Sequence, residues 1–358
     1  MPSLKEIKGR INSISSTLAI TSAMKMVASA KLQKAQMAIQ NMLPYERRLY
    51  SMLLDLMGAM NISAAASEDG SVRGSGSAER GFDQSGDRLS LSNRHDLAGM
   101  DGAYSLMAQR EVRKVAIVAF ASNSSLCGAF NSNAIREATA VINEYRASGL
   151  RDSDIVVYSV GRKMAEAMRK LGFPSPADFT KMSDSPSYEA ASALAQELLD
   201  GFVSGRFDKV ELVYNHYKST SSQPTTRQTY LPLSLADATA DIQVGKITDS
   251  ASESDTNRGA EPVGAPVVRQ GSPTTEDLIV EPSKEALIAT LLPKVVRLRV
   301  FTTLLDSTAA EQAARTVAMQ LATDNGNDLL QELTLEYNKG RQQKITSEIL
   351  DLVGGSLQ

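Results

Sequence analysis

The sequence is poor in the residues that form disulfides and metal sites. Its 358 residues include one cysteine, Cys127, so the chain cannot form an internal disulfide, which fits a reducing compartment. The two histidines, His95 and His216, stand far apart and with a single cysteine do not supply the ligands of a zinc site. The net charge of -3 argues against a general nucleic-acid binder, and we expect no metal and no cofactor.

The glycine-rich motifs of nucleotide-binding enzymes are also missing. No G-x-G-x-x-G follows the first predicted strand and no G-x-x-x-x-G-K-[ST] occurs, so the sequence lacks a phosphate cradle. The turn at 122–128 contains three serines and Cys127, but a serine or cysteine nucleophile needs a nearby base. We therefore expect Cys127 to be a small buried hydrophobic residue, and the chain not to be a catalyst itself.

Long apolar runs are absent as well. No stretch of about 18 apolar residues occurs, and the N-terminus is polar and amphipathic, so we expect neither a membrane-spanning helix nor a signal peptide. The apolar residues instead recur at steps of three or four near the two ends of the chain, which is the period of one helix face.

The N-terminal stretch 4–56 predicts one long helix with a narrow seam, capped at Ser3. Pro44 predicts a kink or a break. Residues 1–50 hold eight lysines and arginines against two glutamates, so this helix is either a solvated face or a surface for an acidic partner. The predicted seam consists of Leu4, Ile7, Ile11, Ile14, Leu18, Thr21, Met24, Ala28, Leu32, Ala35, Ile39 and Met42.

The C-terminal stretch 284–352 predicts a second long helix, opened by Pro282 and Ser283 and bent early by Pro293. At about 1.5 Å per residue the two helices would be roughly 80 and 100 Å long, so they must wrap around each other and project beyond any compact domain. The predicted seam consists of Leu287, Leu291, Val295, Leu298, Phe301, Leu305, Ala309, Ala313, Val317, Leu321, Leu329, Leu333, Tyr337, Ile345, Ile349 and Leu352.

The middle of the chain predicts a small doubly wound α/β domain, because short apolar strands alternate with amphipathic helices. We expect strands at 112–120, 155–160, 209–217 and 229–233, with short ones near Phe179 and at 278–281. We expect helices at 131–148, at 162–171 and from a Ser185-Pro186 start to 203, with a short one at 101–109. The predicted division is 1–61 and 278–358 for the coiled-coil helices, 111–235 for the α/β domain, and 62–110 and 236–277 for two polar insertions.

Six blocks of sequence, in order along the chain, resemble the gamma subunits of F-type ATP synthases. They cover nearly everything except the two polar insertions. The blocks are ITSAMKMVASAKLQKAQ (20–36), LCGAFN (126–131), VYNHYKSTSSQPTTRQTYLPL (213–233), EPSKEALIATLLP (281–293), AARTVAMQLATDN (313–325) and ELTLEYNKGRQQKITSEILDLVGG (332–355).

The resemblance implies an antiparallel coiled coil of the terminal helices inside a hexamer of alternating alpha and beta subunits. The α/β domain would lie at the foot, beside the epsilon subunit and the ring of c subunits. The implied function is that of the central rotor shaft, which couples ion-driven rotation of the c ring to conformational cycling of the catalytic beta subunits. Catalysis would occur on the beta subunits, and the complex would sit at the cytoplasmic face of the bacterial inner membrane, with this chain peripheral.

The resemblance also assigns roles to single residues. Met24, Lys25 and Met26 match the stretch that faces an acidic loop of the beta subunits, which favours the acidic-partner interpretation of the basic helix. The resemblance also implies that Arg315 and three residues of the GRQQKIT motif contact the hexamer; we call these three the catch residues because they would hydrogen-bond the hexamer. It further implies that the end of the last helix forms an apolar contact within the top of the hexamer, which we call the bearing. The catch residues are Arg341, Gln342 and Thr346, and the bearing residues are Ile349, Leu350, Leu352 and Val353.

Some positions depart from the family pattern. Residues 122–128 read SNSSLCG where the family usually has SDRGLCG, so a charged pair is lost and polar contacts of this turn are in doubt. The insertion at 236–276 contains no cysteine, which excludes the thiol control of plastid gamma subunits. Two rivals remain at this stage, namely a static coiled-coil scaffold or adaptor, and an α/β enzyme or nucleotide-binding protein with coiled-coil arms.

Overall fold

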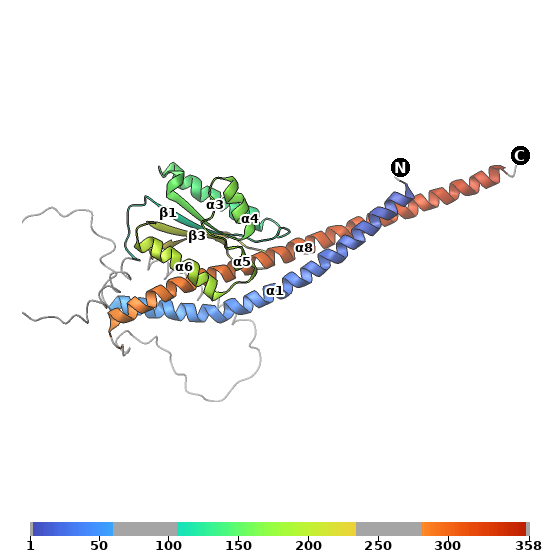
Figure 1. The fold of residues 1–358 in the computed structure, drawn as a ribbon. Helices are drawn as coiled ribbons and strands as arrows, with labels where there is room; N and C mark the ends of the chain where they lie inside the picture. Colours follow the sequence, from blue (N-terminus) through green and yellow to red (C-terminus); the bar gives the residue numbers. More distant parts are fainter. Residues whose placement is uncertain (1–2, 60–105, 234–280, 282, 356–358) are drawn as a thin grey trace, which may run out of the picture.

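A computed structural model describes residues 3–59, 106–233, 281 and 283–355. It contains one sheet, a set of helices packed on it, and two long helices that project far beyond the sheet (Figure 1). The polar insertions predicted at 62–110 and 236–277 lie almost entirely outside the described residues, as does most of the strand predicted at 278–281.

The sheet has four strands in the order β2-β1-β3-β4. β1 (Val115–Phe120), β2 (Ile155–Val160) and β3 (Lys209–Asn215) are parallel, whereas β4 (Thr225–Leu231) runs antiparallel to β3. The antiparallel pairing follows from the short connection at 216–224, because a parallel neighbour would require a crossover of a dozen or more residues. All six residues of β1 are buried, as expected for a central strand covered on both faces.

Helices cover both faces of the sheet (Figure 1). On one face, α3 (Phe130–Ala147) and α4 (Arg162–Lys170) pack on alternate residues of β1 such as Ile117. On the other face, α6 (Tyr188–Val203) and α8 (Lys284–Gly355) pack on residues such as Val118. The short helices η2 (Asp152–Asp154) and α5 (Thr180–Asp184) join these elements. The predicted combination of an α/β domain with two long terminal helices is confirmed.

The long helices α1 (Leu4–Ala59) and α8 run antiparallel and pack along each other. Ser3 and Ser283 cap their starts, because their hydroxyls accept hydrogen bonds from Glu6 N (3.2 Å) and Ala286 N (3.1 Å). The break that was one expectation at Pro44 is wrong, since α1 continues through it. Pro44 is exposed, so solvent can satisfy the carbonyl that loses its helical donor, and Figure 1 shows gentle curvature in both helices.

Several predicted boundaries are wrong in instructive ways. The N-cap of α6 is Ser187, whose hydroxyl accepts from Ala190 N at 3.3 Å, because Pro186 ends α5 instead of starting α6. Phe179 is the N-cap of α5 and not part of a strand. The part of the predicted 101–109 helix that is described begins with a turn at 106–107, where the Leu106 carbonyl accepts from Leu233 N at 2.9 Å.

The N-terminal seam is confirmed, because all twelve predicted members are buried or partly buried. The C-terminal seam is confirmed only in part, since Leu321 is 57% exposed and Leu329 is 45% exposed. Ile345, Ile349 and Leu352 are also exposed, because α8 has no partner helix at that height.

Candidate functional site

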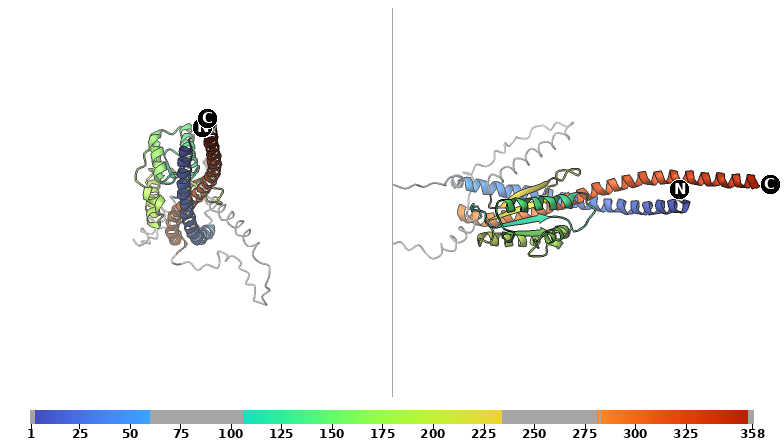
Figure 2. Two further views of the ribbon diagram at one scale, coloured as in Figure 1. Left: turned by 90° about the vertical axis from the view of Figure 1, so that its right-hand side faces the viewer. Right: turned by 90° about the horizontal axis from the view of Figure 1, so that it is seen from above.

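The far end of α8 is a single helix. Leu4, the first residue of α1, lies opposite Gly340, where an added Cβ would stand 3.2 Å from Leu4 Cδ2. α8 continues to Gly355, so its last turns extend past the N-terminus of α1 (Figures 1 and 2). Side chains on this extension are presented to the surroundings from every side.

The three predicted catch residues all lie on this extension. Arg341, Gln342 and Thr346 are exposed, and the Thr346 hydroxyl donates to the Gln342 carbonyl at 2.9 Å. Gln342 and Thr346 are four residues apart and therefore share one face of the helix, with Arg341 beside them. The structure thus brings these three polar side chains together at one height of the shaft.

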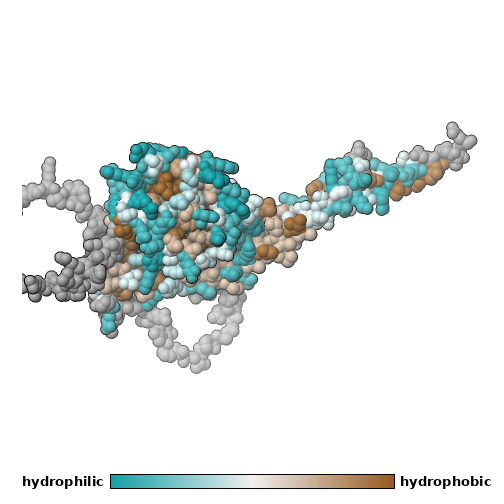
Figure 3. All heavy atoms as spheres, in the orientation of Figure 1, coloured by the Kyte–Doolittle hydropathy of each residue, from teal (hydrophilic) through white to brown (hydrophobic). Residues whose placement is uncertain are grey.

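The tip of the extension is apolar. Ile349, Leu350, Leu352 and Val353 are between 54% and 75% exposed. Figure 3 shows apolar surface near this free end of the shaft, beyond the polar part. An exposed cluster of this kind on a helix end is typical of an interaction surface, because water contact with it is unfavourable.

On its α8 side, the seam between α1 and α8 uses small residues that periodicity did not reveal, namely Thr323 and Gly326. Thr21 and Thr323 share a hydrogen bond of 3.1 Å across the seam. At Gly326 an added Cβ would stand 2.6 Å from Leu18 Cδ2, so the lack of a side chain permits the close approach of the helices. A glycine in the middle of a predicted helix was the available sequence signal, since it implies a packing reason.

The predicted beta-facing stretch is split between two environments. Met26 is 66% exposed, whereas Met24 is partly buried on the seam and Lys25 is partly buried. Met24 also lines an open cavity of about 680 Å³ between α1, α8 and the loops near 124 and 183–186. Arg315 lines the same cavity from α8, so the structure brings these two predicted contact residues near one space.

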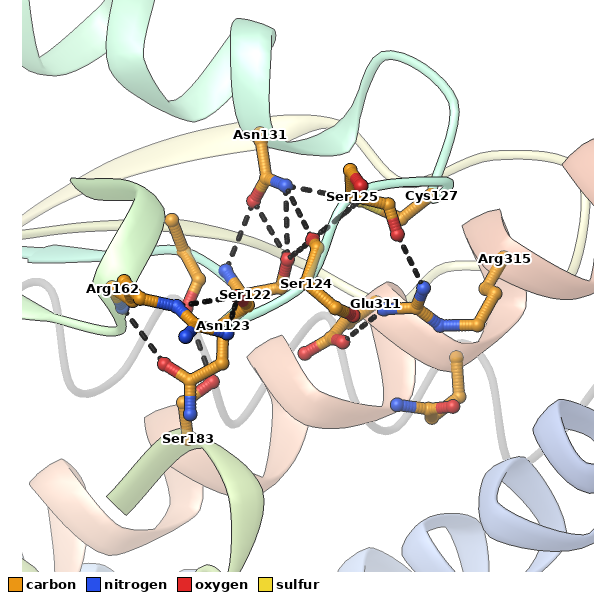
Figure 4. Close-up of polar contacts among 12 residues, drawn as sticks. Ser122, Asn123, Ser124, Ser125, Cys127, Asn131, Arg162, Ser183, Glu311 and Arg315 are labelled. Carbon is orange, nitrogen blue, oxygen red and sulfur yellow. Dashed lines mark hydrogen bonds and ion pairs between the residues drawn. The ribbon is translucent and has the colours of Figure 1, made fainter. Parts of the chain in front are cut away.

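Arg315 is held by contacts within the chain (Figure 4). Its guanidinium donates to the Ser125 carbonyl at 2.7 Å and to Glu311 Oε1 at 2.5 Å, and the residue is 8% exposed. Burial raises the pKa of the Glu311 carboxyl above its ordinary 4.5, while the hydrogen bond and charge of Arg315 oppose that rise. The hexamer contact predicted for Arg315 stays a prediction, but its bonds here join the shaft to the α/β domain.

The turn at 122–128 is stabilised by polar contacts despite its departure from the family pattern (Figure 4). Ser122 N donates to Asn131 Oδ1 at 2.9 Å, and the Asn123 side chain accepts from Arg162 N at 2.8 Å. Cys127 is 1% exposed and packs with Phe130, so the expectation of a small buried hydrophobic residue is confirmed.

Metal-binding and membrane-spanning features are absent from the residues that the structure describes. Neither a group of three His, Cys, Asp or Glu residues suited to a metal ion nor a helix long and apolar enough to cross a bilayer occurs in the described part of the chain. His216, a candidate base, contacts Asp306 instead of Cys127, with Nδ1 2.6 Å from Oδ2.

Comparison with known proteins agrees with this architecture. A family model described as ATP synthase matches residues 3–357. The ATP synthase gamma chain of Phocaeicola vulgatus is 46% identical over 357 residues, and that of Bacteroides thetaiotaomicron is 44% identical over 358 residues, with 100% of each chain covered in both comparisons. A chain from the Euglena gracilis mitochondrial ATP synthase (OSCP/F1/c-ring) has the same fold, with a TM-score of 0.51, 19% identity, and coverage of 98% of this chain and 92% of that chain. Because the family model matches residues 3–357 and these relatives match the chain over its full length, the chain belongs to the ATP synthase gamma chains, the rotor subunits of that enzyme's central stalk.

Proposed function

We propose that this chain turns inside a hexamer of alternating alpha and beta subunits, contributes no catalytic group, and drives the beta subunits between open and closed states. The observation that carries this proposal is the α8 extension, which presents polar residues at one height and apolar residues above them. A helix that could not bury these apolar residues alone is suited to a surrounding sleeve of other subunits.

The polar and apolar levels have different tasks in this proposal. Arg341, Gln342 and Thr346 form directional hydrogen bonds with the hexamer, so they favour particular angular positions of the shaft. The tip residues 349–353 form an apolar bearing. Apolar contact is not directional, and rotation within such a sleeve therefore costs little at any angle.

The curved shaft accounts for the coupling. Because its two helices end at different heights and curve gently (Figure 2), the shaft presents a different surface to each of the three beta subunits. Each contact then shifts the population of one beta subunit between its states through differential contact energy. Met24, Lys25 and Met26 are assigned to an acidic surface of the beta subunits, and Arg315 to the same level of the hexamer.

At the other end, the α/β domain is assigned to the epsilon subunit and the c ring. This places the chain peripherally at the cytoplasmic face of a bacterial inner membrane. The support is family membership together with the position of the domain at the opposite end of the shaft from the α8 extension (Figure 1).

Reconstitution tests the proposal. Purified alpha and beta subunits are mixed with and without this chain, and ATP hydrolysis and rotation of a probe on the α/β domain are measured. We expect sustained ATP hydrolysis and rotation only when the chain is present. An assembly that hydrolyses ATP without rotating the probe would support the static scaffold and refute the rotor.

A sharper version targets the catch residues. Arg341→Ala and Gln342→Ala each remove hydrogen bonds to the hexamer, and we expect turnover to fall about threefold to tenfold with helix content unchanged. Arg169→Ala is the matched control, because Arg169 is an exposed arginine on α4, away from the shaft. Equal kinetics of the catch variants and the control would remove the catch assignment.

A further inference from the structure

The connection between β3 and β4, residues 216–224, is a tightly bonded turn. Its ends are joined by His216 N donating to the Pro224 carbonyl at 2.8 Å. Within it, Ser219 and Ser222 exchange backbone hydrogen bonds of 3.1 and 3.2 Å, and the Gln223 side chain donates to the carbonyls of Ser219 and Thr220 at 3.0 and 2.6 Å. A turn whose polar groups bond to one another holds its shape, so its outward contacts are well positioned.

The turn is hydrogen-bonded to α8 through the carboxylate of Asp306. The Tyr217 backbone N–H donates to Asp306 Oδ1 at 2.9 Å, and His216 Nδ1 lies 2.6 Å from Asp306 Oδ2. Because an ionised carboxylate only accepts, His216 carries a proton on Nδ1 and donates it. Both Asp306 oxygens therefore contact the α/β domain. The side chain is 18% exposed, so these contacts lie at a partly buried site.

The same turn is hydrogen-bonded to α1 through the side chain of Tyr217. Gln36 Nε2 donates to the Tyr217 hydroxyl at 2.6 Å. The Tyr217 ring packs against two buried apolar clusters. One cluster joins α1 to α8 through Leu32 and Ala309, and the other joins the 127–130 segment to α8 at Ala310. Tyr217 therefore contacts both helices of the shaft and the α/β domain at once.

The chemistry of this junction differs from that of the seam around it. Leu32 and Ala309 meet through apolar contact, which resists separation but not small rotations of one helix against the other. Hydrogen bonds to Asp306 and Tyr217 fix distance and angle, because they weaken steeply when bent. The three hydrogen bonds here, two to Asp306 on α8 and one from Gln36 on α1, restrain how each helix can move relative to the α/β domain.

We propose that the 216–224 turn is a torque brace, which makes the α/β domain, α1 and α8 turn as one body, with Asp306 and Tyr217 as its positioning residues. This rests on the rotor function proposed above. A torque applied at the α/β domain must reach the catch residues without being lost as rotation between the parts. The brace lies where the α/β domain meets both helices, below the stretch in which the two helices continue alone.

The test uses the complete ATP synthase in vesicles, with ion pumping and ATP hydrolysis measured together. Tyr217→Phe removes the hydroxyl that accepts from Gln36 and keeps the ring. Asp306→Ala removes the carboxylate that accepts from His216 and from the Tyr217 backbone N–H. Tyr188→Phe is the matched control, because its ring packs edge-on against Phe301 of α8 (5.8 Å between centroids) and stays in place. Circular dichroism of each full chain checks that the variants fold.

We expect ATP hydrolysis by the detached alpha–beta complex with each chain to stay near the wild-type rate. We expect ions pumped per ATP hydrolysed to fall about threefold to tenfold in Tyr217→Phe, the factor that one net hydrogen bond is worth in an equilibrium, and by at least as much in Asp306→Ala, which removes two contacts. The control should pump normally. Normal coupling in both brace variants overturns the brace but leaves the rotor intact, whereas failure of the wild-type chain to support rotation overturns the rotor itself.

A covalent rescue separates a brace from a general structural contact. In the variant Gln36→Cys with Tyr217→Cys, a short bismaleimide joins α1 to the 216–224 turn at their point of contact, while native Cys127 stays unlabelled because it is 1% exposed. We expect low pumping per ATP before cross-linking and recovery after it. Pumping that stays low after complete cross-linking would show that holding these parts together is not what the contact contributes.

Discussion

Removal of the Arg315 side chain should destabilise the chain more than the loss of any exposed arginine. Arg315 and Glu311 form an i,i+4 pair at 2.5 Å, and both side chains are 10% exposed. In Arg315→Ala, Glu311 keeps its buried position but loses its cation, and the Ser125 carbonyl loses its donor. Glu311 is then buried without its charged partner, which is the costly way to break such a pair.

The size of the effect follows from the burial. Breaking a buried ion pair by removing one partner costs about 3–5 kcal/mol, and for a chain of this size that lowers the melting temperature by roughly 4–7 °C. Replacing both residues together, as Arg315→Leu with Glu311→Leu, removes the two charges at once and should cost much less. The double variant therefore distinguishes a buried charge from simple loss of packing.

The loss should also depend on pH. The pKa of Glu311 is already raised by burial, and it rises further in Arg315→Ala because Arg315 no longer lowers it. A raised carboxyl pKa means that the folded state binds the proton more tightly than the unfolded state does. Protonation of Glu311 therefore stabilises the fold at low pH, and this stabilisation is lost as the pH rises through the folded-state pKa. The difference in unfolding free energy between wild type and Arg315→Ala should therefore become smaller as the pH falls from about 8 toward 5.

Urea unfolding of the full chain, followed by circular dichroism at several pH values, measures this gap. Arg10→Ala is the matched control, because Arg10 pairs with Glu6 at 2.9 Å in the same i,i+4 geometry but with side chains 60% and 51% exposed. We expect no measurable change in the control, since exposed pairs contribute little. An Arg315→Ala chain that unfolds at the wild-type urea concentration, or a gap that does not change with pH, would refute the reasoning.

Two further substitutions test close backbone and helix contacts by thermal unfolding of the full chain. Gly161→Ala should cost at least about 3 kcal/mol, because φ is +95° and the new Cβ would stand 2.0 Å from the Ala121 carbonyl oxygen. Gly149→Ala, with φ at +97° and open space around it, should cost only about 1–2 kcal/mol, and equal losses would contradict the clash. Gly326→Ala should destabilise the shaft by about 1 kcal/mol, because overpacking against Leu18 exceeds the gain in helix propensity. Adding Leu18→Ala should then cost less than the sum of the two single losses, and strict additivity would contradict the predicted contact.

The α/β elements were predictable because local signals and burial agree there. β2 matches its predicted range of 155–160, and α4 ends near Gly172, whose φ of +91° is the left-handed conformation expected after a helix. The predicted boundaries were wrong where a tertiary contact determines the end of an element. β3 ends at Asn215, two residues early, because the next residues turn toward Asp306 on α8.

The C-terminal seam failed for a geometric reason. From Phe301 to Leu321 the predicted stripe advances by five steps of four residues, and at 3.6 residues per turn each such step rotates by about 40°. Near the α/β domain the predicted residues are still buried or partly buried despite this rotation, because several elements cover α8 there. Above the α/β domain, α1 is the one described element beside α8, and the true seam passes through Thr323, Gly326 and Leu333 instead of Leu321.

The candidate site depends on how the two long helices are aligned along the shaft, which the sequence alone could not supply. The catch motif was recognisable from its residues, but its exposure follows from the end of α1 opposite Gly340. The brace was hidden for the opposite reason, since Gln36, Tyr217 and Asp306 are far apart in sequence and each is unremarkable by type. In the rotor proposed above, directional hydrogen bonds lie where the α/β domain and the shaft must not slip, and the exposed apolar residues from Ile349 onward lie where the shaft must turn. A rotor needs that order, because reversing it would leave the α/β domain free to rotate around a shaft held fast at its tip.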